Sequence, residues 1–186
     1  ILTFDIEDWF HIKFEKNFTN DKVYSGFEHR LEHQLFKILN ILEEKNIDAT
    51  FLCLGWIAQR YPHLIKEISN RGHEVGSHTN MHRLVNSQTA KEFENDLKTS
   101  IDVITNITSS PVTCFRAPAF SIKKDNKWAF EVLYENNIEI DLSIFPAKRD
   151  YGGYNGVKIN KPHWISYNEC KLKEFPINSS SILGKS

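Results

Sequence analysis

Two histidines four residues apart are the first feature of this sequence that could do chemistry. His78 and His82 lie in the stretch GSHTNMH, which follows an apolar run and is too polar for a core helix. Such pairs also occur by accident, and two unrelated surface histidines are the plainer interpretation. However, two neutral imidazoles with one carboxylate form the three-ligand set of catalytic metal sites, which leaves a position open for water. The pair therefore predicts a metal site only if a carboxylate reaches it.

An acidic cluster near the start of the chain could supply that carboxylate. The stretch TFDIEDWF places Asp5 at the end of an apolar run, with Glu7 and Asp8 just beyond it. A carboxylate at a strand end is held in place, which suits a general base, and a neighbouring one could reach the metal. A bound metal lowers the pKa of water to about 7. A solvated or capping loop is the alternative, and it fits poorly with Trp9 and Phe10 next in the chain.

The hydrophobic pattern predicts the elements that position these residues. Apolar runs typical of strands occur at residues 1–4, 49–55, 73–78, 112–120, 138–145 and 172–177. Apolar residues at three- and four-residue spacing predict helices over residues 28–45, from Ile57 to a left-handed cap at Gly72, 89–104 and 125–137. This alternation predicts right-handed crossovers and a largely parallel sheet, either open and doubly wound or closed into a barrel.

The candidate residues follow the predicted strands, at the carboxyl edge where such sheets bind ligands. Asp5 to Asp8 follow the first strand, His78 to His82 the third, Arg116 the fourth and Asp141 the fifth. Segments far apart in the chain are thus expected to converge on one rim. The alternative for Arg116 is a structural ion pair with Asp141 or Glu139, and Asp141 could simply end its strand.

Composition excludes several classes of protein. The chain of 186 residues is 40% hydrophobic and 25% charged, as expected for a globular domain, and its net charge of −1 argues against nucleic-acid binding. No stretch approaches 18 apolar residues, so we expect no membrane span. Three cysteines far apart, without a CxxC, argue against a disulfide framework and a cysteine-based zinc site.

Four stretches make the sequence similar to a known family. TFDIEDWFH, GHEVGSHTNMH, FRAPAFS and DLSIFP, in this order and spacing, resemble the polysaccharide deacetylases of carbohydrate esterase family 4, the NodB-homology domain. The similarity is greatest to the branch associated with exopolysaccharide biosynthesis, which reads D-V-E-D-W/Y-F where chitin deacetylases read T-F-D-D-G. This resemblance covers nearly the whole chain. It implies an α/β fold, a distorted (β/α) barrel, and metal-dependent removal of N-acetyl groups from sugar polymers.

The resemblance also implies roles for single residues. Asp5 matches the catalytic base, His78 and His82 match the two histidine ligands, and Arg116 matches the arginine that holds the base carboxylate.

The first motif departs from the T-F-D-D-G pattern, because Ile6 follows the base where the metal aspartate is expected. The ligand must then be Glu7 or Asp8, and we favour Asp8 because the family's ligand is an aspartate. Trp9, which follows the acids, and Pro118 and Phe120 of the third motif are the expected substrate-binding residues.

A late histidine of the family, thought to protonate the leaving amine, has no counterpart here. His163, in KPHWIS, is the only histidine beyond His82, and its context does not match. The chain also opens on Ile1 in a strand-like run without a Met. We therefore expect residues 1–186 to be a single NodB-homology catalytic domain, incomplete at both ends and lacking the C-terminal part of the barrel.

The predicted function is hydrolysis of N-acetyl groups on N-acetylhexosamine units of a polysaccharide or oligosaccharide. Two His and one carboxylate suit Zn²⁺, and Co²⁺, Ni²⁺ or Fe²⁺ would fit similarly. Two alternatives stay open: a cyclic-amide hydrolase similar to allantoinase on the same fold, and a non-catalytic carbohydrate-binding pseudoenzyme. The sequence indicates a bacterial protein and does not encode the polymer, the oligomeric state, or a choice between cytoplasm and cell envelope.

Overall fold

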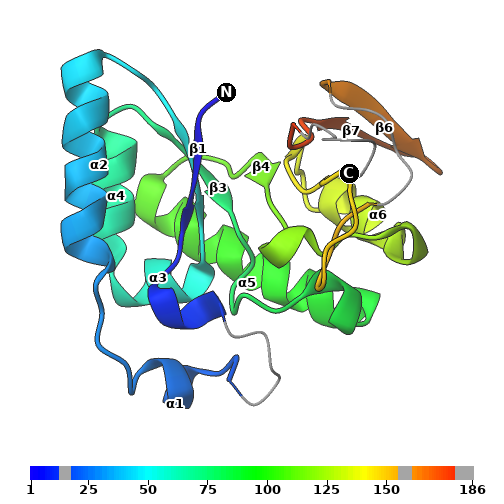
Figure 1. Cartoon of the computed structure of the whole chain (residues 1–186), viewed down its shortest axis with the longest axis horizontal. Coiled ribbons are helices and arrows are strands. Elements are labelled where there is room, and N and C mark those ends of the chain that lie inside the picture. The colour runs from blue at the N-terminus through cyan, green and yellow to red at the C-terminus, as the bar shows by residue number, and fades with distance from the viewer. Residues whose placement is uncertain (13–17, 155–160, 179–186) are drawn as a thin grey trace, which may run out of the picture. The chain divides into compact units, whose positions relative to one another are not determined.

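The computed structural model of the chain describes residues 1–12, 18–154 and 161–178. They belong to two units. The first unit comprises Ile1–Arg83 and Asp96–Val112, and the second comprises Leu84–Asn95 and Thr113–Ser186. Figure 1 shows the elements of both units, coloured along the chain.

The first unit is built on three parallel strands. They are β1 (Thr3–Ile6), β2 (Thr50–Cys53) and β3 (Glu74–Ser77). In the register, Asp5 of β1 lies opposite Leu52 of β2, which lies opposite Gly76 of β3. All four residues of β2 are buried, as expected for a central strand of a parallel sheet. The carboxyl ends of β1 and β3 therefore lie one strand apart at the same edge.

The first unit also contains helices. They are α1 (Asp21–Tyr24), α2 (Leu31–Lys45), α3 (Gly55–Arg60), α4 (Pro62–Asn70) and, from Asp96 onward, α5 (Ala90–Thr108). Helices α2 and α4 lie side by side (Figure 1). Helix α2 buries Leu35, Leu39 and Leu42, one stripe at three- and four-residue spacing. A 3-10 helix at Trp9–Ile12 follows β1 and buries Phe10 and His11.

The helix predicted from Ile57 to Gly72 is two helices in the structure. Pro62 is the first residue of α4, and Tyr61 before it has φ −129° and ψ 59°, which is not helical. A proline at the first turn of a helix is favourable, whereas inside a helix it removes a hydrogen bond, so the chain breaks here. The predicted left-handed cap at Gly72 is confirmed, with φ +84°.

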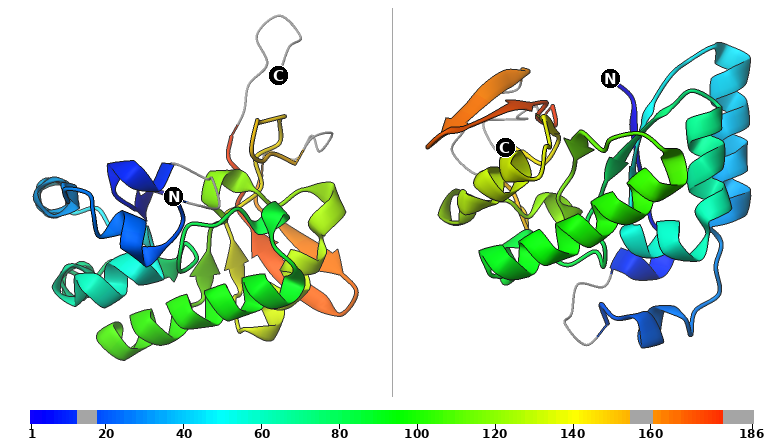
Figure 2. Two further views of the ribbon diagram at one scale, coloured as in Figure 1. Left: turned by 90° about the horizontal axis from the view of Figure 1, so that it is seen from below. Right: turned by 180° about the vertical axis from the view of Figure 1, so that it is seen from behind.

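The second unit combines parallel and antiparallel strands. They are β4 (Cys114–Phe115), β5 (Ile140–Asp141), β6 (His163–Tyr167) and β7 (Cys170–Glu174). Strands β4, β5 and β7 pair in parallel, and β6 pairs antiparallel with β7 (Figure 2). Helix α6 (Trp128–Glu135) precedes β5. The apolar pattern of the sequence does not predict β6, whose residues are all partly or fully exposed and lack the apolar run of a buried strand. None of the helices that the structure describes has the length and apolar character needed to cross a membrane.

Candidate active site

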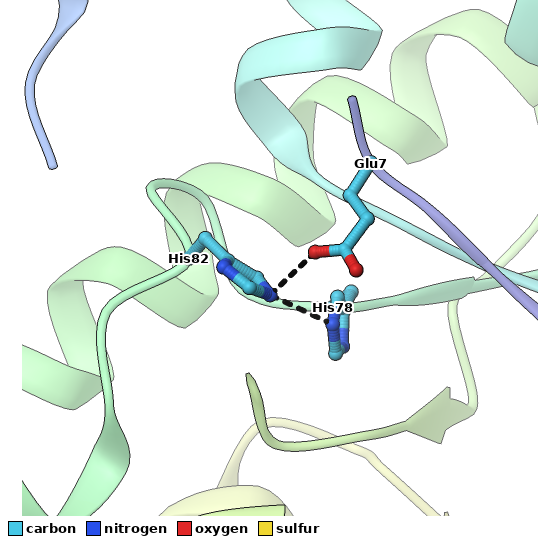
Figure 3. A group of neighbouring side chains, drawn as sticks. All are labelled: Glu7, His78 and His82. Atoms are coloured by element: carbon cyan, nitrogen blue, oxygen red, sulfur yellow. Dashed lines mark hydrogen bonds and ion pairs between the residues drawn. The ribbon is translucent and has the colours of Figure 1, made fainter. Parts of the chain in front are cut away.

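Glu7, His78 and His82 converge at the carboxyl edge of the first unit's sheet. The side chains point toward one another from the end of β1 and from the loop after β3 (Figure 3). Glu7 Oε2 lies 2.7 Å from His82 Nε2, which lies 3.2 Å from His78 Nε2. All three ligand atoms lie within 4.8 Å of one another, and both histidines are buried. The predicted pair of histidines is thus brought together with a carboxylate.

Alternation along β1 decides which acids face the histidines. Ile6 is buried in the core, so Asp5 and Glu7 on either side of it point to the opposite face. Asp5 Oδ2 lies 3.9 Å from His78 Nε2, and the Asp5 side chain is 28% exposed. A general base must be accessible and must lie beside the histidines. The Asp5 carboxylate meets both conditions.

The loop after β3 adopts an unusual backbone that brings the two rings together. Thr79 and His82 both have positive φ, 70° and 56°. Non-glycine residues adopt this left-handed region only where surrounding contacts hold them. One such contact closes the turn, because the backbone N–H of His82 donates to Thr79 Oγ1 over 3.1 Å.

A main-chain carbonyl sets the tautomer of His82. Its Nδ1 lies 2.7 Å from the carbonyl oxygen of His11, and because a carbonyl can only accept, Nδ1 carries the proton. The other nitrogen, Nε2, then presents a lone pair to Glu7 and His78. The His11 ring is itself buried, and burial, with the nearby His82, lowers its pKa to about 3. His11 therefore stays neutral at any ordinary pH.

In this tautomer two acceptor atoms, His82 Nε2 and Glu7 Oε2, face each other. Glu7 Oε2 is buried and has no hydrogen-bond partner among the described residues. Burial acts to raise the pKa of the Glu7 carboxyl, but the neighbouring imidazoles, His82 first and then His78, outweigh it, and the pKa is lowered. An ionised carboxylate facing two imidazole nitrogens is an arrangement that a divalent cation would stabilise. The residues present therefore fit a metal with two nitrogen ligands and one oxygen ligand.

Asp8 lies elsewhere, although we expected it to be the carboxylate ligand. Its Oδ1 accepts from the backbone N–H of Trp9 over 2.9 Å, and its Oδ2 accepts from that of Arg30 over 3.0 Å. Oδ2 also lies 3.3 Å from His29 Nδ1. Asp8 thus ties the segment after β1 to the residues that precede α2. The signal that points to Glu7 in the sequence is its two-residue spacing from Asp5, which places both on one face.

The family of the chain follows from a match to a family model. The polysaccharide deacetylase family model matches residues 15–133, more than half of the chain. The chain belongs to the polysaccharide deacetylase family. The resemblance inferred from the four sequence stretches is thereby confirmed.

A relative and two solved structures are similar to this chain. A peptidoglycan-N-acetylglucosamine deacetylase of Bacillus cereus is 31% identical over 96 residues, which cover 51% of this chain and 35% of the relative. A crystal structure of an assigned polysaccharide deacetylase from Mycobacterium smegmatis superposes with a TM-score of 0.74 at 21% identity, covering 95% of this chain and 57% of that one. An allantoinase superposes with a TM-score of 0.61 at 16% identity, covering 78% of this chain and 43% of that one. The predicted α/β fold of the NodB type is confirmed, and the chain spans between about a third and three fifths of these proteins.

The remaining predicted residues of the deacetylase motifs lie in both units. Arg116, in the second unit, is buried and donates from Nε to the carbonyl of Leu142 over 3.3 Å, with its guanidinium 5.8 Å from the Phe120 ring centre. Its pairing with Asp5 of the first unit stays a prediction. Trp9, in the first unit, is 45% exposed and donates from Nε1 to the carbonyl of Glu28 over 3.0 Å. Part of its ring is therefore open to a ligand.

The third motif has a strained backbone. Ala119 and Phe120 follow Pro118 with φ of 50° and 54°. Gly152 packs directly on this turn, because a Cβ at its position would lie 2.2 Å from the carbonyl oxygen of Ala119. The adjacent Gly153 donates its N–H to the carbonyl of Phe120 over 2.9 Å. Pro118 is buried and Phe120 is partly exposed, so of these two predicted substrate-binding residues Phe120 has the surface to contact a ligand.

The second unit contains two neighbouring buried acids, of which the sequence indicated only one. Asp141 is among the candidate residues predicted at the strand ends, whereas Glu174 is not. Asp141 Oδ1 accepts from the Ser143 hydroxyl over 2.5 Å, and Glu174 Oε1 accepts from the backbone N–H of Ile144 over 3.1 Å. Their other oxygens are buried without a partner among the described residues. Burial, and then the neighbouring Asp141, raises the pKa of Glu174 well above its usual value.

Proposed function

We propose that this polysaccharide deacetylase is a metal-dependent hydrolase that removes N-acetyl groups from N-acetylhexosamine units of a polysaccharide. The observation that carries the proposal is the convergence of Glu7, His78 and His82 on one point, with Asp5 beside them. This arrangement supplies three ligands and a separate base, which together are the components of metal-assisted amide hydrolysis.

In this proposal Glu7, His78 and His82 hold the cation. We prefer Glu7 to Asp8 because both oxygens of Asp8 already accept backbone N–H groups. The two nitrogens and one oxygen suit Zn²⁺, while Co²⁺, Ni²⁺ and Fe²⁺ accept similar ligands. When bound, such a cation polarises the acetamide carbonyl and makes water a stronger acid at neutral pH.

Asp5 is the proposed general base. Its carboxylate takes the proton of the attacking water, whose oxygen bonds to the acetamide carbon. The C–N bond then breaks, acetate leaves, and the amine nitrogen takes the proton that Asp5 had accepted. In the family resemblance, Arg116 matches the arginine that holds the base carboxylate. Trp9 would form a wall for a sugar ring, because its partly exposed ring lies just beyond the acids.

The proposed substrate is a glycan with N-acetylglucosamine residues. A Bacillus cereus relative carries the name peptidoglycan-N-acetylglucosamine deacetylase, and it matches about half of this chain. The D-I-E-D-W-F motif points instead to the exopolysaccharide branch of the family. Both kinds of polymer present the same acetamide group, so the test has to include both.

Acetate release from N-acetylglucosamine oligomers and from peptidoglycan tests the proposal. The full natural protein is treated with chelator, given back Zn²⁺ or Co²⁺, and compared with Asp5→Asn. We expect activity to vanish with chelator, to return with metal, and to be lost in Asp5→Asn. Metal binding without acetate release from any of the glycans would favour the carbohydrate-binding pseudoenzyme, and ring opening of allantoin would favour the cyclic-amide hydrolase. Absence of metal binding would overturn the proposed ligands.

A further inference from the structure

The loop that carries His82 has its backbone polar groups paired by residues from several elements. The carbonyls of Thr79, Asn80 and Met81 accept from the N–H of Gly55, the N–H of Trp56 and the hydroxyl of Tyr24, over 3.0, 3.1 and 3.0 Å. The N–H groups of Asn80 and Met81 both donate to Asp96, over 2.7 Å to Oδ2 and 3.3 Å to Oδ1. Asp96 lies 14 to 16 residues further along the chain, on α5.

Asp96 differs from the other partners of this loop in its charge. Each of its two carboxylate oxygens accepts one backbone N–H, and the side chain is buried. Hydrogen bonds to an ionised acceptor are roughly twice as strong as neutral ones. Asp96 therefore holds two successive N–H groups of the loop in one orientation.

Close packing leaves the loop little room to move on its other side. A Cβ at Gly55 would lie 2.5 Å from Asn80 Oδ1 and 2.8 Å from the Cα of Ser100 on α5. The loop, the start of α3 and the middle of α5 are thus in direct contact at this point. A loop held between two helices can keep a backbone conformation that it would leave if it were free.

The held conformation is the one that the ligand geometry requires. Thr79 and His82 flank the two residues that Asp96 binds, and both have left-handed backbones. With these angles the His82 Nε2 lies 3.2 Å from the His78 Nε2. If the N–H groups of Asn80 and Met81 were released, the loop could relax toward ordinary φ values, and His82 would turn away from His78.

We propose that Asp96 is a positioning residue for the metal site, because its carboxylate clamps the Asn80 and Met81 amides and so holds His82 in ligand geometry. This inference rests on the proposed function, since it takes His78, His82 and Glu7 as the metal ligands. Asp96 acts through the backbone and touches neither substrate nor metal.

Asp96→Asn is the sharpest test, because both oxygens of Asp96 accept N–H groups. The amide has the same size, but one of its positions is an NH₂ donor that must face the N–H of Asn80 or Met81. The matched control is Asp102→Asn, the same change at an exposed position of α5. Leu42→Ala, at a buried position of α2, is a second control that lowers stability without touching the loop.

Three quantities are measured on the full natural protein and its variants. They are the affinity for Zn²⁺ by competition with a chelating dye, the visible absorption spectrum with Co²⁺, and the thermal midpoint of the metal-free form. We expect Asp96→Asn to weaken Zn²⁺ binding by about 10- to 100-fold and to change the Co²⁺ spectrum, as when a residue that orients a ligand is lost. Both controls should bind Zn²⁺ and absorb with Co²⁺ as the wild type does, even where Leu42→Ala melts at a lower temperature.

The outcomes separate this inference from the proposed function. Unchanged Zn²⁺ affinity and Co²⁺ spectrum in Asp96→Asn would overturn the role of Asp96 alone. Absence of Zn²⁺ binding in the wild type would overturn the ligand set, and this inference with it. If Asp96→Asn does not fold, Asp96→Glu keeps the charge and both acceptors but lengthens the side chain. A changed Co²⁺ spectrum in Asp96→Glu would then support the inference, and an unchanged one would overturn it.

Discussion

His82 donates its Nδ1–H to the backbone carbonyl of His11 over 2.7 Å, and this bond directs its Nε2 lone pair toward Glu7 and His78. The partner is a main-chain group, in the 3-10 helix that follows β1. The same segment of chain therefore supplies the carboxylate of the site, through Glu7, and the group that orients its histidine. The positions of the Glu7 carboxylate and of the His82 ring therefore both depend on the conformation of the chain just beyond β1.

Removal of metal should destabilise the protein. A ligand present at 100 times its dissociation constant stabilises the native state by about 2.7 kcal/mol, because it binds the folded form only. For a chain of this size, each kcal/mol shifts the melting temperature by about 2–4 °C. We therefore expect excess Zn²⁺ to raise the melting temperature of chelator-treated protein by roughly 5–10 °C. The same addition to His78→Ala should leave it unchanged, and an equal rise in both would contradict the site.

Glu7→Gln should weaken metal binding, whereas Asp8→Asn should lower the folding stability. Glu7→Gln removes the charged ligand atom, and we expect Zn²⁺ affinity to fall by more than about 100-fold, beyond the effect typical of an outer residue. Asp8→Asn places an NH₂ group against the N–H of Trp9 or Arg30, which should cost about 1–3 kcal/mol of folding free energy. Titration calorimetry and urea denaturation measure the two effects. Weakened Zn²⁺ binding in Asp8→Asn, with unchanged binding in Glu7→Gln, would show that Asp8 is the ligand.

Asp5→Asn should lower the turnover number while leaving the metal in place. Loss of a general base typically reduces the rate by about 10²–10⁴-fold. Asp5 Oδ2 lies 3.9 Å from His78 Nε2, outside hydrogen-bond distance, so we expect Zn²⁺ affinity to change by less than roughly 10-fold, the lower limit for a residue that orients a ligand. Acetate release and dye competition on the same preparation check both parts. A variant that loses metal together with activity would make Asp5 a ligand rather than the base.

Glu174→Gln should change how stability depends on pH. Burial raises the pKa of Glu174 above its ordinary value of 4.5, so the unfolded chain releases this proton first. The free energy of unfolding of the wild type should therefore fall as pH rises from about 4.5 toward the raised pKa. In Glu174→Gln, the amide does not titrate, and this part of the fall should be absent.

Urea denaturation at pH 5 and pH 8 measures this difference. Glu174→Leu is the control, since it has a similar size but no hydrogen-bonding group. Glu174→Leu leaves the N–H of Ile144 without its acceptor. This should lower the free energy of unfolding by about 1–3 kcal/mol at both pH values. Parallel pH dependence in the wild type and Glu174→Gln would show that Glu174 does not hold the proton.

The sequence by itself determined the components that depend on local pattern. His78 and His82 are recognisable because four-residue spacing after a strand end is visible in the chain, and the alternating elements follow from the period of their apolar residues. Asp5 is recognisable for the same reason, since it ends an apolar run. These features depend on neighbours within a few residues, and the structure has them where they were predicted.

Only the tertiary structure decided which further residues join them. Asp8 does not face the histidines, because its carboxylate accepts the backbone N–H of Arg30, 22 residues further along the chain. Asp96 reaches Asn80, and Glu174 lies beside Asp141, across separations of 16 and 33 residues. Strand β6 forms by antiparallel pairing with β7. No period in the sequence records such pairs, because they depend on the packing of elements that are distant along the chain.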